Sequence, residues 1–173
     1  MTESKIIGVC GPIEASDAVK YINAFKLGVE ETDPSVTVNV IYTGSFQDSA
    51  LSAAAAETLI AGGADILTGI AASLPCMNAA QERGLLYFGV QGDWTELGPE
   101  TVPATLAYDW SPVINDLIAT YQAGVAGGKV YNTSLQNGGL VLIYSDIVEI
   151  PEEAMQAAEA AIQGIEDGSV KLP

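Results

Sequence analysis

The sequence contains no histidine and only six Lys and Arg residues, against 22 Asp and Glu residues. Histidine is the commonest general base and metal ligand, so its absence removes the Ser/His/Asp and Cys/His nucleophile arrangements and most zinc sites. A net charge of −16 also gives no electrostatic basis for binding nucleic acid or an anionic membrane surface. We therefore expect a protein that is not an enzyme, carries no metal and binds no nucleic acid.

Cysteine is scarce as well. The two cysteines, Cys10 and Cys76, fit neither a disulfide framework nor a paired-cysteine metal motif, and we expect both to be small buried residues. Gly, Asp and Ser interrupt the apolar stretches before they could span a bilayer, and residues 1–5 are too short and polar for a secretory signal. From the sequence as given, we expect the chain to stay where it is made.

Phosphate-binding loops and resident cofactors lack support too. The segment from Gly8 to Gly11 follows an apolar run, but its spacing matches neither the dinucleotide fingerprint nor the P-loop, and no Lys or Arg stands near it to meet a phosphate. We expect no nucleotide phosphate at this site and no cofactor.

What is present is a chain of 173 residues with 49% hydrophobic residues, enough for one domain with a substantial core. Short apolar runs alternate with stretches of helical spacing, and Gly or Pro marks most boundaries. The expected strands are residues 5–10, 36–42, 64–68, 85–90, 103–108 and 138–144, and the expected helices are residues 16–31, 49–61, 74–83, 112–126 and 151–167. This alternation predicts a doubly wound parallel α/β sheet with helices on both faces, in one domain over residues 1–173.

In such folds ligands bind at the carboxyl ends of the strands, so the segments that follow the strands are the candidate site. These segments are residues 11–16, 43–48, 69–73, 91–95 and 108–111. They carry the aromatic residues Phe46, Trp94, Tyr108 and Trp110, together with hydrogen-bonding groups, but no Lys or Arg. The composition favours a neutral or positively charged small molecule with a flat face.

Several of these residues have two interpretations. Phe46 could stack on a ligand or cap the core beneath its loop. Asp93 and Asp109 could form an acid/base pair, although aspartates at such positions more commonly cap helices or face solvent. Trp94 could be a lid on the strand ends, and the carboxylates of Glu14, Asp17 and Asp48 are most simply helix-start residues.

Seven segments, in one order along the chain, resemble the basic membrane protein (BMP) family of substrate-binding proteins. These segments are residues 21–25 with 27–29, 42–48, 59–66, 79–84, 89–93, 108–112, and 150–153 with 167–168. The similarity covers nearly the whole chain. Family members are lipid-anchored, extracytoplasmic clamshells of type I periplasmic binding fold whose two lobes close on a nucleoside or another heterocycle for an ABC permease.

The resemblance implies that this chain is the second lobe (residues 1–108) with a returning helix at residues 111–127 and a terminal strand and helix at residues 138–168. The first lobe, with its signal sequence and lipid-anchored cysteine, would be missing. The helix after Pro112 would pack on that lobe in the family, so we expect its face of Val113, Leu117, Ile118 and Tyr121 to be exposed or covered otherwise. The chain would pair with a second copy as a homodimer, pair with a separately encoded first lobe, or be a fragment of a longer protein.

The resemblance also assigns pocket positions. Phe46 matches a stacking ring, Ser73 a polar pocket position, and Gln91 a position where members carry Asp or Asn toward the ligand. Tyr108 lies at the end of the hinge strand. The predicted ligand-binding residues are Phe46, Ser73, Gln91, Asp93, Tyr108 and Trp110.

This chain departs from the family pattern at two places. Ile70, Ala71 and Ala72 stand where relatives are polar, and Gln91 cannot act as the charged acid that holds ribose in nucleoside binders. With half of the pocket missing, we expect weak affinity for a small heterocyclic solute. A structural or regulatory half-module that acts through association is the alternative.

Overall fold

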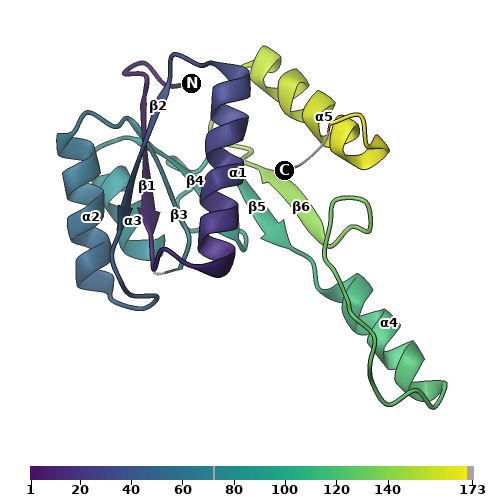
Figure 1. The fold of residues 1–173 in the computed structure, drawn as a ribbon. Coiled ribbons are helices and arrows are strands. Elements are labelled where there is room, and N and C mark those ends of the chain that lie inside the picture. The colour runs from purple at the N-terminus through teal and green to yellow at the C-terminus, as the bar shows by residue number, and fades with distance from the viewer. Residues whose placement is uncertain (72, 171–173) are drawn as a thin grey trace.

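The computed structural model describes residues 1–71 and 73–170, and within them the chain forms one six-stranded sheet and five helices (Figure 1). The strands lie in the order β2-β1-β3-β4-β5-β6. Their bounds are β1 Ile6–Gly11, β2 Thr37–Tyr42, β3 Ile66–Gly69, β4 Leu86–Gln91, β5 Ala104–Tyr108 and β6 Leu140–Tyr144. The first five strands are parallel, and β6 runs antiparallel to β5. The predicted fold class is confirmed, with one antiparallel strand added at the edge.

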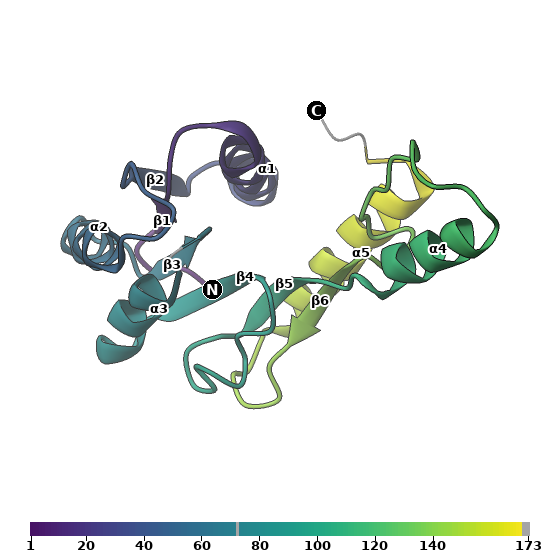
Figure 2. The ribbon, with the colours of Figure 1, turned by 90° about the horizontal axis from the view of Figure 1, so that it is seen from below.

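Helices cover both faces of the sheet, as predicted (Figure 2). The helices are α1 Ser16–Thr32, α2 Ser49–Ala61, α3 Ser73–Glu82, α4 Ser111–Gln122 and α5 Glu152–Asp167. α2 and α3 pack together on one face, whereas α1 and α5 line a cavity on the other. α4 extends away from the sheet beyond the end of β5 (Figures 1 and 2).

The main core lies between the sheet and the pair α2 and α3. Its fully buried side chains include Leu67, Tyr87 and Met77, and alanines of α2 and α3 allow the helices to come close. Gly8 on β1 is part of this close approach, because an added Cβ would lie 2.6 Å from Leu67 Cδ2 and 2.9 Å from Leu59 Cβ. The small residues of this layer therefore set the distance between helices and sheet.

One predicted boundary is wrong. The helix expected over residues 111–127 ends at Gln122, with Ala123 as its C-cap. Gly124 takes a left-handed conformation, with φ of +83°, and this turn ends the helix before Gly127 and Gly128 are reached. The earlier of two glycine signals therefore sets the end of α4.

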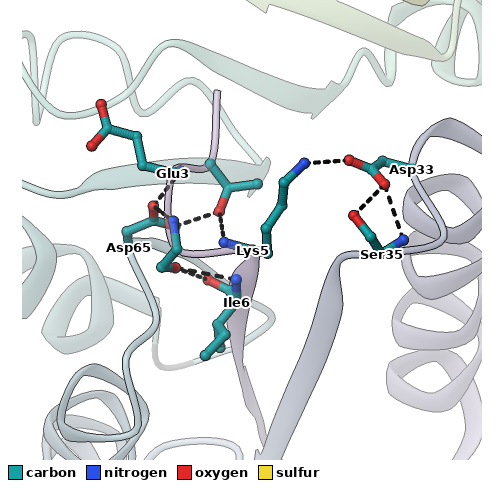
Figure 3. Close-up of polar contacts among 8 residues, drawn as sticks. Glu3, Lys5, Ile6, Asp33, Ser35 and Asp65 are labelled. Atoms are coloured by element: carbon teal, nitrogen blue, oxygen red, sulfur yellow. Dashed lines mark hydrogen bonds and ion pairs between the residues drawn. The ribbon is translucent and has the colours of Figure 1, made fainter.

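A polar cluster fixes the amino-terminal segment against the sheet (Figure 3). The Asp65 carboxylate accepts hydrogen bonds from the hydroxyl of Thr2 (2.7 Å) and from the backbone N–H groups of Glu3 (2.6 Å) and Ser4 (2.8 Å). Partial burial opposes ionisation of Asp65, but these hydrogen bonds outweigh it and lower its pKa. Nearby, Lys5 pairs with Asp33 at 2.5 Å and, with Ser35, holds the pKa of Asp33 well below its usual value. These contacts lie at the amino ends of the strands, opposite the candidate site.

Candidate functional site

The candidate site is the edge of the sheet at which β1 to β5 end, here called the carboxyl edge. Because these five strands are parallel, the segments after them meet at this one edge, toward which Figure 2 looks. All six predicted ligand-binding residues lie on the segments after β2, β3, β4 and β5 or at the ends of those strands. These six residues differ in exposure: some are exposed at the carboxyl edge, and others are buried or hydrogen-bonded within the fold.

Phe46 is presented by a loop whose backbone is tightly held. Thr43 and Gly44 donate backbone hydrogen bonds to the carbonyls of Gly11 and Pro12, at 2.9 and 2.7 Å. Asp48 then caps α2 by accepting from the N–H groups of Ala50 and Leu51, each at 3.0 Å, so its interpretation as a helix-start residue is confirmed. The ring of Phe46 is 50% exposed, and it therefore stands largely in solvent at the carboxyl edge.

Gln91 ends β4 with an unusual backbone. Its φ is +74°, in the left-handed region that glycine favours, and its side chain is exposed. Ala71, in the segment after the neighbouring strand β3, is also left-handed, with φ of +55°. Non-glycine residues in this conformation store strain of about 1–3 kcal/mol, and such strain is concentrated at functional sites. Sequence reasoning missed both, because neither Gln nor Ala is a residue type that marks this conformation.

Tyr108 and Trp110 form an aromatic pair beyond the end of β5. Their ring centroids lie 5.5 Å apart with 49° between the ring planes, and both side chains are partly exposed. Gln91 pairs with Ala107 in the register of β4 and β5, so Gln91 lies next to this pair at the edge. The structure therefore places Gln91 and the Tyr108 and Trp110 pair at the ends of neighbouring strands.

Phe46 lies at the other end of the same edge. Between β2 and β5 stand β1, β3 and β4, and the four interstrand steps of about 4.8 Å place the strand ends roughly 19 Å apart. One flat ring cannot stack on Phe46 and on the Tyr108 and Trp110 pair at the same time. The carboxyl edge thus offers two separate stacking surfaces.

Ser73 is largely buried at the start of α3. Its hydroxyl donates to the carbonyls of Gly69 (3.1 Å) and Ala71 (3.2 Å), so it supports the turn between β3 and α3. Ile70 is buried in a small apolar cluster with Ala18 and Val90, so its side chain is part of the core. Ala72, the third residue of the departure from the family pattern, lies outside the described residues.

The carboxylates of Asp93 and Asp109 accept hydrogen bonds from residues of their own turns. Asp93 accepts from the N–H (2.9 Å) and the hydroxyl (2.6 Å) of Thr95, and Asp109 accepts from the N–H of Ser111 at 2.8 Å. The hydrogen bonds from Ser111 lower the pKa of Asp109, which keeps that carboxylate ionised. Each carboxylate is thus held by its own turn, which argues against an acid/base pair. Neither caps a helix, because α4 has Trp110 at its N-cap with no side-chain cap, and the described residues between Asp93 and β5 form no helix.

Trp94 belongs to the core. Its indole N–H donates to the carbonyl of Val90 at 2.9 Å, and its ring contacts Tyr87 with centroids 6.0 Å apart. The interpretation of Trp94 as a lid on the strand ends is therefore not what the structure shows. The half-buried Trp94 packs against the core cluster that includes Tyr87 of β4 and Met77 of α3.

An apolar groove of about 360 Å³ lies away from the carboxyl edge, between α1 and α5. Its lining includes Tyr21 and Phe25 of α1, Phe88 and Leu142 of the sheet, and Met155 of α5. The hydroxyl of Tyr144, also in the lining, is buried and has no hydrogen-bond partner among the described residues. Burial raises the pKa of Tyr144.

α4 presents a second apolar surface. None of its twelve residues, all of which the structure describes, is buried. We call its exposed apolar side chains the α4 face; they are Ile114, Leu117, Ile118 and Tyr121. Leu117, Ile118 and Tyr121 are exposed as predicted, whereas Val113 of the predicted face is only partly exposed. The exposed apolar surface continues to Val125 and Val130 in the segment that follows.

Metal-ligand groups and membrane-spanning helices also bear on the kind of site. Within residues 1–71 and 73–170, no group of three or more Cys, Asp and Glu side chains is arranged to hold a metal ion. No helix in that part of the chain is both long and apolar enough to cross a membrane.

The sequence was compared with known families, and residues 1–172 match a family described as "ABC transporter substrate-binding protein PnrA-like", named Bmp. The chain belongs to the Bmp family. The family resemblance inferred from the seven segments is thereby confirmed. Its members are substrate-binding proteins rather than enzymes, in agreement with the prediction from the missing histidines.

Two relatives are similar to this chain in sequence, and a solved structure shares its fold. A purine-binding protein of Brucella abortus (strain 2308) is 26% identical over 98% of this chain and 48% of its own length. The nucleoside-binding protein BmpA of Lactococcus lactis is 21% identical over 99% of this chain and 54% of its own length. A solute-binding protein of an ABC transporter system from Aeropyrum pernix K1 shares the fold, with a TM-score of 0.81 at 19% identity, over 96% of this chain and 57% of that chain. The chain therefore spans about half the length of the relatives it matches.

Proposed function

We propose that this chain is one lobe of a solute-binding protein for an ABC transporter, and that its carboxyl edge binds a small neutral heterocycle such as a purine base or nucleoside. Membership of the Bmp family is the observation that carries the proposal. The purine-binding and nucleoside-binding relatives support the choice of ligand class. By the same reasoning, the working location is extracytoplasmic and the protein partner is a membrane permease.

The chemistry of the carboxyl edge supports a neutral, flat ligand. Phe46, Tyr108 and Trp110 offer exposed aromatic faces, on which a heterocycle can stack. Gln91 offers an exposed amide that can both donate and accept a hydrogen bond, and so can pair with a polar group outside the stacked ring. The five segments at this edge contain no Lys or Arg to hold a phosphate.

In this proposal Phe46 stacks on the ring of the solute. Its loop is already fixed by hydrogen bonds to the end of β1 and by the cap of α2, so stacking costs little ordering of the backbone. Gln91 and the Tyr108 and Trp110 pair are too far along the edge to share that ring, and they contact the solute elsewhere or contact the opposite lobe. Asp93 and Ser73, which already have partners, support the loops.

The α4 face is the surface for the complementary lobe. A twelve-residue helix with four large apolar side chains in solvent gains stability from a covering surface, and a second lobe that completes the clamshell would supply it. Closure of two lobes around a solute would then produce the form that a permease recognises. A single lobe buries only one side of a ligand, so its affinity would be low.

This proposal can be tested by two-dimensional NMR, because the method detects weak binding. The isotopically labelled chain is titrated with hypoxanthine and with adenosine. We expect shift changes concentrated on the segment around Phe46, on which the ring stacks. Phe46→Ala should reduce the changes strongly, whereas Tyr121→Ala, which removes an exposed aromatic ring from α4, should leave them unchanged. No shift changes up to the solubility limit, or changes that map elsewhere, would show the proposal to be wrong.

A further inference from the structure

The two cysteines of the chain lie together beneath the carboxyl edge. Both carry free thiols, and both are buried, at 2% exposed for Cys10 and 0% for Cys76. Cys10 stands near the end of β1, where it is paired with Gly69 of β3 in the sheet register. Cys76 is on α3, and its thiol donates to the carbonyl of Thr68 at 3.8 Å. The fold thus places a thiol from α3 over the strand beside Cys10.

Gly69 leaves the space in which these side chains meet. A Cβ at this position would lie 3.3 Å from Cys10 Cβ and 3.7 Å from the hydroxyl of Tyr87. With no side chain on Gly69, Cys10 and Cys76 pack in one buried cluster, in which the Cys76 thiol reaches Thr68, the residue before Gly69. Tyr87, which is fully buried, closes the site from β4.

The surroundings also determine when these thiols can react. The neighbouring Cys10 thiol, together with burial, holds the pKa of Cys76 well above its ordinary value. Because the thiolate is the reactive form, the pair is protected once the chain has folded. Oxidation therefore has to occur while the chain folds and the two sulfurs are still accessible.

We propose that Cys10 and Cys76 form an oxidisable pair whose disulfide joins β1 to α3 beneath the carboxyl edge. The oxidant is a small disulfide such as oxidised glutathione. The Cys76 thiolate attacks that disulfide and releases one glutathione thiolate, which leaves Cys76 in a mixed disulfide. The Cys10 thiolate then attacks the Cys76 sulfur and releases the second glutathione. The two cysteines are oxidised, the glutathione disulfide is reduced to two thiols, and the two cysteine protons end on them.

This disulfide would have a structural effect on the proposed binding edge. It would hold the start of α3 against β1 and so restrain the left-handed Ala71, which lies between β3 and α3. A cross-link between positions so far apart in the sequence also restricts the unfolded chain. The proposal does not depend on the solute, because it concerns the chemistry of the pair alone.

Refolding of the full chain from urea with oxidised glutathione, compared with refolding in reductant, tests the proposal. We expect the oxidised product to lose the mass of two hydrogen atoms, to show no reactive thiol in urea, and to yield a proteolytic fragment in which Cys10 and Cys76 are joined. Its urea midpoint should exceed that of the reduced chain, and reductant should reverse all of these changes.

Cys76→Ala and Cys10→Ala are the matched controls. Each leaves one thiol, which can keep its hydrogen or take up one glutathione but cannot close the intramolecular bond; circular dichroism establishes that each variant is folded. The proposal is overturned if the refolded wild-type chain keeps two free thiols, carries a glutathione on each cysteine, or forms disulfides only between chains.

Discussion

Similar apolar residues are buried in the sheet and its packed helices but exposed in the helix α4. In the sheet, Leu67 and Tyr87 are fully buried, and even glycines such as Gly8 are in contact with neighbouring side chains. In α4, Leu117 and Ile118 are each about half exposed. Similar apolar residues thus produce a core in one region and an uncovered surface in the other. Their spacing predicts an element and its apolar face, but not what covers that face.

The two regions also differ in what holds them in shape. The sheet is stabilised by contacts between residues far apart in the sequence, such as those between β1 and β3. α4 relies on local features: Pro112 at its start, Gly124 after its end, and the ion pair between Asp116 and Lys129, which ties the following segment to the helix. A helix of this length is marginal in water without a packing partner. The α4 region is therefore expected to open locally far more easily than the sheet.

The largest expected difference between the two regions comes from the same substitution, Leu to Ala, made once in each. Leu67→Ala removes a fully buried side chain and should lower the free energy of unfolding by about 2–5 kcal/mol, because it leaves a cavity. Leu117→Ala, at a residue that is 50% exposed on α4, should change it by less than about 0.5 kcal/mol. Urea unfolding followed by circular dichroism measures both, and equal losses would mean that the α4 face is packed in the isolated chain.

Glycine substitutions sharpen the comparison between packed and open positions. At Gly89 on β4, an added Cβ would lie 2.5 Å from Thr105 Oγ1 and 2.7 Å from Trp94 Cδ1, so Gly89→Ala should cost about 1–3 kcal/mol through overpacking. At Gly28 on α1, an added Cβ would meet no other atom of the described residues within 4 Å. Gly28→Ala should therefore stabilise the chain by about 0.5–1 kcal/mol through helix propensity. Denaturation midpoints that move in the same direction for both variants would contradict this packing.

The polar cluster at the amino ends of the strands gives a pH-dependent contrast. The pKa of Asp65 is lowered in the folded chain, so its contribution to stability is present above the usual carboxyl pKa of about 4 and is lost as the pH falls through the lower folded value. Asp65→Asn should cost about 1 kcal/mol at neutral pH, and the difference from wild type should shrink in acid. Thermal unfolding at a series of pH values checks this, and a difference that stays constant with pH would count against the Asp65 contacts.

The smallest expected effect concerns the strained backbone at the carboxyl edge. Gln91→Gly relieves the left-handed conformation, and after the entropic cost of glycine it should stabilise the chain by about 0.5 kcal/mol. Gln47→Gly, in the loop after β2, is the control; Gln47 is not left-handed, so it should lose stability or stay unchanged. A loss of stability in Gln91→Gly, measured in urea, would mean that the side chain of Gln91 makes stabilising contacts.

Much of the fold could be predicted from the sequence because its signals are local. Apolar runs and Gly or Pro boundaries located the strands and helices within a few residues, and α2 was predicted with the bounds that the structure gives. The predicted end of α4 was wrong because two glycine signals follow the helix and only the conformation of Gly124 decides between them. The antiparallel direction of β6 depends on where the chain returns after α4, and no local pattern encodes that.

The candidate site was predictable in its position but not in its detail. Parallel strands bring the loop segments to one edge, which follows from topology alone. That Trp94 turns into the core and Ser73 binds backbone carbonyls depends on long-range packing, as does the separation of Phe46 from Tyr108 along the edge. The left-handed Gln91 has no sequence signal at all. These are the features in which tertiary contacts override residue type.

The most direct test of whether the α4 face is built to be covered by another surface is hydrogen exchange. It is measured at several concentrations of the chain, with light scattering to establish the mass at each. At dilutions where the chain is a monomer, the account predicts that amides of α4 exchange quickly, whereas those of β1, β3 and β4 exchange only on global unfolding. Protection of α4 should rise only when a partner or a second copy covers it. If α4 in the monomer is protected as strongly as β3, the helix already has its packing partner within this chain, and the central comparison is wrong.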